Sequence, residues 1–90
     1  MARFRIMTWN GIPAQVKADD DQGGRANREM PAWFAGEIDR IAMRDGLAGT
    51  DEYTAGFKWS RPEEREGTAE EVVDAVIREQ CAAWGRPADG

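Results

Sequence analysis

The sequence predicts a small α+β domain with the element order ββαβα. An N-terminal run of β-forming residues is broken by Asn10-Gly11, a strong hairpin signal. Helical periodicity appears later at residues 31–45 and 68–84, with an alternating aromatic stretch between them. Ninety residues suffice for one domain, residues 1–90, with a modest core. We expect a three-stranded sheet in the order second–first–third, with both helices on one face so that both apolar stripes are buried.

The first two strands are predicted at Arg3–Trp9 and Ile12–Ala18. The first segment is rich in aromatic and branched residues, and the second follows a two-residue turn that fixes the register of the pair. Pro13 cannot donate a ladder hydrogen bond, so the second strand is expected at the edge of the sheet. The expected cross-strand partners are Trp9 with Ile12, Met7 with Ala14, and Arg5 with Val16.

Two amphipathic helices are predicted. The first spans Pro31–Asp45, because proline suits the first helical turn and Gly46 suits the left-handed residue that ends a helix. The second begins at the capping box formed by Thr68 and Glu71 and stops before the glycine and proline at 85 and 87. Their apolar faces consist of Phe34, Ile38, Ile41 and Ala42 in the first, and Ala69, Val72, Val73, Val76, Ala83 and Trp84 in the second.

The remaining segments carry weaker patterns. Tyr53–Ser60 alternates aromatic and other residues, which predicts the third strand; the alternative is a helix through Tyr53 and Phe57, which Gly56 disfavours. Residues 19–29 are polar and aperiodic and predict a mobile loop, while residues 61–67 form a charged connector. The three aspartates at the start of that loop lack the spacing of a calcium-binding loop, so no metal site is expected.

Composition excludes several classes of function. A net charge of −5 disfavours nucleic acid and anionic membranes as partners, and Arg3 and Arg5 are too few to form a basic patch. The chain has no histidine, which excludes a Ser–His–Asp triad and imidazole metal ligands. A single Cys81 excludes an intrachain disulfide and fits a packed residue better than a nucleophile. No signal peptide or membrane span is apparent, so we expect a cytoplasmic protein without a cofactor.

The predicted fold has more apolar surface than two helix stripes can cover. Either the polar loop folds over the second face of the sheet, or that face binds another molecule. In the same way, Trp33 either packs under a neighbouring loop or joins an outer patch on the first helix. The leading hypothesis is a non-catalytic domain that binds a protein partner or forms a homodimer. The candidate partner surface consists of Met7, Trp9, Trp33, Arg40, Met43 and Trp59.

A second hypothesis is a small ligand-binding or carboxylate-dependent enzyme domain. Carboxylates serve as acid and base when their environments separate their pKa values. The candidate polar site consists of Asp39, Asp51 or Glu52 near Arg25 and Arg28.

Several short motifs in this order resemble the small bacterial virulence factor domain. They are Ile12-Pro13-Ala14-Gln15-Val16, Gly24-Arg25, Met30-Pro31 with Phe34, Ile38-Asp39, Ala42-Met43, and Gly46-Leu47-Ala48-Gly49-Thr50-Asp51 with Tyr53. A related domain forms the C-terminal part of conserved virulence factor C proteins, which also contain a NifU-like iron–sulfur scaffold domain and HEAT-type repeats. The resemblance implies an accessory bacterial domain with links to iron–sulfur or one-carbon metabolism. This chain lacks scaffold cysteines and repeats, so a cluster-related role would require a partner.

Overall fold

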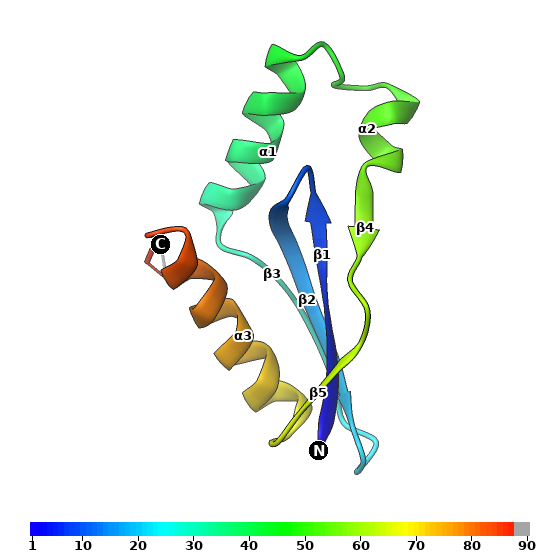
Figure 1. Ribbon diagram of the computed structural model, residues 1–90, viewed down its shortest axis with the longest axis vertical. Helices are drawn as coiled ribbons and strands as arrows, with labels where there is room; N and C mark the ends of the chain where they lie inside the picture. The colour runs from blue at the N-terminus through cyan, green and yellow to red at the C-terminus, as the bar shows by residue number, and fades with distance from the viewer. Residues whose placement is uncertain (88–90) are drawn as a thin grey trace.

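The computed structural model describes residues 1–87, and Figure 1 shows the arrangement of its helices and strands. An antiparallel sheet carries α1 and α3 on one face, with α2 on the other side of the sheet near the end of the first hairpin. The α+β class is therefore confirmed. The elements are β1 (Ala2–Trp9), β2 (Ile12–Asp20), β3 (Arg25–Glu29), α1 (Ala32–Arg44), α2 (Asp51–Ala55), β4 (Phe57–Trp59), β5 (Glu63–Arg65) and α3 (Ala69–Ala83).

The sheet has five strands in the described residues, so the prediction of three was wrong. The expected neighbours are present as β2, β1 and β4, but β3 extends the sheet beyond β2. Both β4 and β5 pair with β1, β4 with Met7–Trp9 and β5 with Ala2–Phe4. They are two short strands on the same side of β1, separated by a few residues that belong to neither. The hairpin turn is as expected, since Asn10 and Gly11 both have positive φ, at 52° and 81°.

A strand and a tight turn replace the loop predicted over residues 19–29. β2 continues to Asp20, and β3 returns along it from Arg25 to Glu29. The Asp20 carboxylate orders the turn by accepting hydrogen bonds from the backbone N–H groups of Gln22 (2.9 Å) and Gly24 (2.8 Å). Because β3 pairs with β2 along Gln15–Asp19, most of β2 is internal rather than an edge strand.

The same carboxylate joins the sheet to α3. Asp20 also accepts a hydrogen bond from the backbone N–H of Ala69, the first residue of α3, at 2.9 Å. These bonds to Ala69, Gly24 and Gln22 hold the pKa of Asp20 below its usual value. A depressed pKa in the folded state contributes stability at pH values above the unfolded-state pKa, and this contribution is lost as the pH falls through the folded-state value.

We therefore expect Asp20→Asn to flatten the acid limb of the stability curve. Between pH 5 and pH 2, urea denaturation should show a smaller loss of stability in the variant than in the wild type, although the variant is less stable at neutral pH. Asp21→Asn is the control, because Asp21 contacts the N-terminal amine and accepts no backbone N–H bond within residues 1–87. An equally steep loss of stability with falling pH in Asp20→Asn and in the wild type would contradict the lowered pKa of Asp20.

Residues 53–60 divide between a helix and a strand, so the prediction of one continuous strand was wrong. Thr50 caps α2 by accepting the backbone N–H of Tyr53, and Asp51 and Glu52 lie in the first turn, where negative charge is favourable. Gly56 ends this short helix, and β4 begins directly after it. The charged connector predicted at residues 61–67 likewise contains β5.

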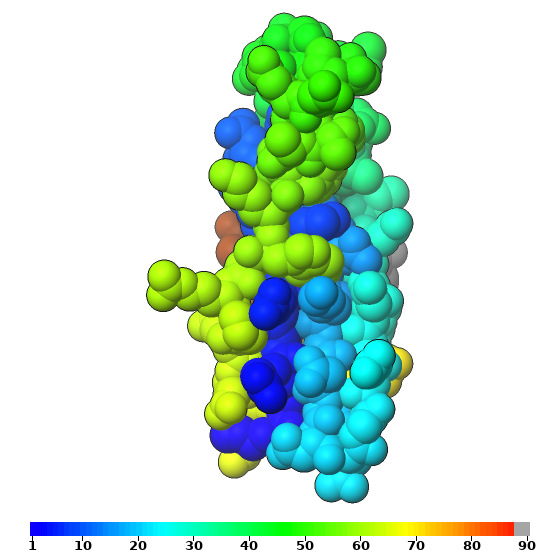
Figure 2. Space-filling view, turned by 90° about the vertical axis from the view of Figure 1, so that its right-hand side faces the viewer, coloured from blue at the N-terminus to red at the C-terminus, as the bar shows by residue number. Residues whose placement is uncertain are grey.

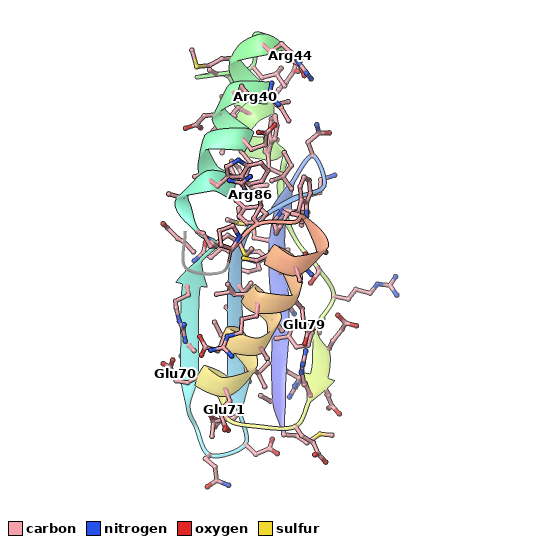
Figure 3. The ribbon with its side chains drawn as sticks, turned by 90° about the vertical axis from the view of Figure 1, so that its left-hand side faces the viewer. Arg40, Arg44, Glu70, Glu71, Glu79 and Arg86 are labelled. Atoms are coloured by element: carbon pink, nitrogen blue, oxygen red, sulfur yellow. The ribbon has the colours of Figure 1, made fainter. Side chains whose placement is uncertain are left out.

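The two longer helices follow the sequence prediction. α1 begins after Pro31 and ends where Gly46 takes a φ of +70°, and the Leu47 N–H then bonds the Ala42 carbonyl at 2.7 Å. α3 opens on the complete capping box of Thr68 and Glu71. The two helices follow one another along the same face of the sheet, with α1 toward the turn of the first hairpin and α3 toward the opposite end (Figure 3). Their buried faces contribute to one core with the sheet.

Candidate interaction surface

The sheet face opposite α1 and α3 is covered by α2 only near the hairpin turn, and we call the remainder the open face. Figure 2 looks onto it and shows the side chains of β5, β1, β2 and β3 as neighbouring columns. On β1 the exposed Arg3 and Arg5 alternate with residues that pack toward the helices. The open face consists of Arg3, Arg5, Met7, Gln15, Lys17, Asp19, Arg25, Asn27, Glu29, Trp59 and Glu64.

A bulge in the first hairpin sets which side chains reach this face. The register shifts between Met7 and Thr8, so that Met7 pairs with Gln15 and Thr8 with Pro13. The sequence-based register, which placed Arg5 opposite Val16, was therefore wrong beyond the bulge. Arg5 pairs instead with Lys17, and Val16 is fully buried beneath the helices.

Three cations surround a hollow in the open face. The hollow has a volume of about 170 Å³, and its lining consists of Arg3, Arg5, Lys17, Asp19 and Pro62. Within residues 1–87, none of its three cations forms an ion pair. The Lys17 ammonium lies 4.2 Å from the ring centroid of Trp59, so an aromatic side chain adjoins the hollow. We call this site the cationic hollow.

Two arginines on the helical side of the sheet are paired with α3, in contrast to the cations of the hollow. On β3, Arg28 donates to Asp74 at 2.6 Å and to Glu70 at 2.9 Å, both on α3. On β5, Arg65 forms an ion pair with Glu79, also on α3 (Figure 3). These contacts raise the pKa of both guanidinium groups. Acidic residues of α3 therefore neutralise these two arginines.

A groove of about 370 Å³ lies between α1, α2 and the end of β3. Its polar residues include Asp39 of α1 and Tyr53 of α2, whose hydroxyl donates to the Asp39 carboxylate at 3.4 Å. Burial and the neighbouring Asp39 raise the pKa of Tyr53. The lining consists of Met7, Ala14, Gln15, Glu29, Met30, Ala32, Ala35, Ile38, Asp39, Tyr53 and Phe57.

The predicted partner surface divides into separate places. Met7 and Trp59 are cross-strand partners on the open face, and Trp59 is 36% exposed. Trp9 was expected to be exposed but is only 3% exposed, because α2 and Phe57 cover it and its indole N–H bonds the Tyr53 carbonyl at 2.9 Å.

The other three predicted surface residues lie on α1. Trp33 is half-buried against Phe34 and Trp84, with the Arg86 guanidinium 4.6 Å from its ring centroid. Arg40 pairs with Glu37 on the same helix, and Met43 is 71% exposed. Trp33 therefore belongs to the junction of α1 with the end of α3 rather than to the open face.

The predicted polar site residues are likewise dispersed. Arg25 is on the open face, whereas Arg28 is on the opposite face of β3, held by α3. Asp39 lines the groove, and Asp51 is the exposed first residue of α2. The sequence analysis missed the cationic hollow, although Arg3 and Arg5 at alternate positions of one strand and Lys17 on the next were a usable signal.

Within residues 1–87, no group of three or more acidic or cysteine side chains is placed to hold a metal ion. No helix in this part of the chain has the length and apolar character needed to cross a membrane. Cys81 is buried on α3, and burial raises the pKa of its thiol, which disfavours the reactive thiolate.

These features define a small α+β domain with an antiparallel sheet that is open on one face and charged there. The chain belongs to the virulence factor family, whose family model matches residues 7–86. Comparison with curated proteins and with solved structures found no significant match.

Proposed function

We propose that this chain is a non-catalytic accessory domain that binds a partner protein through the open face of its sheet. The observation that supports this most directly is the exposed Trp59 beside Met7 on a sheet face that no long helix covers. Tryptophan and methionine are enriched in protein interfaces, and an apolar cluster with a polar rim is the usual form of such a site.

The titratable groups also favour binding over catalysis. Apart from Asp20, Tyr53 and Cys81, the shifted pKa values in residues 1–87 belong to arginine–carboxylate pairs near the surface. Such pairs keep both partners charged at neutral pH, whereas a general acid or base needs a pKa near the working pH.

Site-specific photo-crosslinking tests the proposal in the cells that produce the protein. A benzophenone amino acid at position 59 should give a covalent adduct with a partner, because this side chain lies in the proposed interface. The same amino acid at Ala82, an exposed residue on α3, is the control and should give none. Adducts at both positions, or at neither, would contradict binding through the open face. Light scattering after gel filtration distinguishes a second copy of this chain from another protein.

The groove supports binding of a small ligand as a second candidate function. Its lining combines apolar side chains with the exposed Tyr53–Asp39 hydrogen bond, a combination common in ligand sites. Thermal denaturation with a panel of metabolites from one-carbon metabolism and iron–sulfur cluster assembly tests this. A ligand at 100 times its Kd stabilises the folded state by about 2.7 kcal/mol. Stabilisation that Tyr53→Phe weakens would support the groove. Melting temperatures unchanged across the panel would contradict it.

A further inference from the structure

We propose that the cationic hollow binds carboxylate groups from an acidic segment of the partner protein. This inference rests on the proposed function and names the chemistry of the partner that the open face accepts. Arg3, Arg5 and Lys17 supply the positive charge, and Trp59 adjoins the hollow through its contact with Lys17.

The direct pairing of Arg5 with Lys17 is the first observation that supports a ligand. Like charges that face each other across two antiparallel strands destabilise a sheet. Within residues 1–87 neither side chain forms an ion pair, and the Lys17 ammonium lies instead over the ring of Trp59. An anion that bridges Arg5 and Lys17 would offset the repulsion that remains between them.

The distribution of charge over the two faces is the second observation. The whole chain carries −5, and acidic residues of α3 pair with Arg28 and Arg65 on the helical side. On the opposite side, the three cations of the hollow form no ion pair within residues 1–87, although the Asp19 carboxylate is part of the same lining. A guanidinium group binds a carboxylate through two parallel hydrogen bonds, and such charge-assisted bonds are stronger than neutral ones.

The position of the hollow is the third observation. It lies at the interruption between β4 and β5, where the chain leaves β1 and Pro62 contributes no backbone N–H. A side chain from another molecule can enter here, while its neighbours contact Met7 and Trp59 on the same face. An acidic segment with an apolar residue close to its carboxylates therefore fits the combined surface.

Carboxylates of the open face favour a short acidic polypeptide over a nucleic acid. Asp19 and Glu64 are the cross-strand partners of Arg3, and Glu29 lies at the opposite end of the face. These groups and the negative field of the whole chain repel any anion that extends beyond the hollow. A phosphate backbone carries a charge at every nucleotide, whereas a peptide can place neutral residues between its carboxylates.

The interaction can be measured with the ¹⁵N-labelled full chain. The probe is a twelve-residue peptide of alternating glutamate and leucine, and the matched peptide has glutamine in place of glutamate. We expect the acidic peptide to shift backbone amide signals of β1, β2 and β4 and the glutamine peptide not to shift them. Arg5→Glu and Lys17→Glu should each weaken binding roughly tenfold or more, as expected for the loss of one charge-assisted contact.

Arg44→Glu is the matched control for the charge reversals. It changes the net charge by the same amount but lies at the end of α1, beside Asp45 and away from the sheet. Peptide affinity close to that of the wild type in this variant supports a local site. Equal weakening in all three variants, or no binding of the acidic peptide, would overturn the proposal. Tighter binding of a twelve-nucleotide oligouridylate than of the peptide would also overturn it.

A neutral substitution separates ligand binding from a structural role. Arg5→Gln should weaken peptide binding while the melting temperature stays the same or rises by about 1–5 °C, because the repulsion from Lys17 is removed. A lower melting temperature with unchanged peptide affinity would assign Arg5 a structural role instead. The cross-linking at position 59, repeated in Arg5→Glu, distinguishes the two proposals. If the partner adduct persists there, the partner-binding function stands and the acidic-segment inference fails.

Discussion

Phe34→Ala is expected to lower the free energy of unfolding by about 3–5 kcal/mol, the range for removing a fully buried phenylalanine. Phe34 is 0% exposed and is the largest fully buried side chain of the core. Its ring meets Trp33 edge-on at a centroid distance of 5.1 Å and Trp84 at 6.0 Å. The substitution therefore loses packing between α1, the sheet and the end of α3 at once.

Urea denaturation followed by circular dichroism measures this loss. A domain of this length is stable by roughly 5–13 kcal/mol, at about 0.05–0.15 kcal/mol per residue, so the variant should approach the limit of folding. Met43→Ala on the same helix is the control, because Met43 is 71% exposed and should change stability by less than about 0.5 kcal/mol. Similar losses in both variants would mean that α1 packs differently from the arrangement described.

The same substitution at two glycines is expected to have opposite effects. Gly56→Ala should destabilise the fold by about 1–3 kcal/mol, the usual range for overpacking. A methyl group there would lie 2.6 Å from Nε1 of Trp9, so the indole would have to move and its bond to the Tyr53 carbonyl would be disturbed. Gly36→Ala should stabilise by about 0.5–1 kcal/mol, since Gly36 lies within α1 and open space surrounds its added methyl.

Two measurements check this pair. Denaturation midpoints give the sign of each effect, and the indole N–H resonance of Trp9 reports its hydrogen bond directly. We expect that resonance to move in Gly56→Ala and to remain in place in Gly36→Ala. Stabilisation by both substitutions would show that α2 does not pack on Trp9.

Local signals in the sequence were sufficient for the helices and the first turn. The capping box at Thr68 and the glycine after α1 act within a few residues, so their structures follow from the sequence itself. Asn10-Gly11 determined the hairpin for the same reason, because both residues adopt the positive φ that the turn needs.

β3 was missed because its own residues carry no strand pattern. Only Ala26 among the five residues of β3 is buried, so no alternating apolar pattern is visible. On β3, Arg28 faces α3 and donates to two of its carboxylates. In the turn before β3, the Asp20 carboxylate also accepts a bond from the first residue of α3. Both arrangements depend on residues more than forty positions away along the chain.

The sequence by itself determined the α+β class, the two long helices, the first hairpin and the excess of apolar and aromatic side chains. Only the tertiary structure decided which of those side chains remain exposed. α2 covers Trp9, while the bulge opposite Met7 and Thr8 places Lys17 rather than Val16 beside Arg5 on the open face, with Trp59 next to Lys17. The physical reason is that a one-residue shift in strand register moves every side chain beyond it to the other face of the sheet, and such a shift depends on packing across the whole domain.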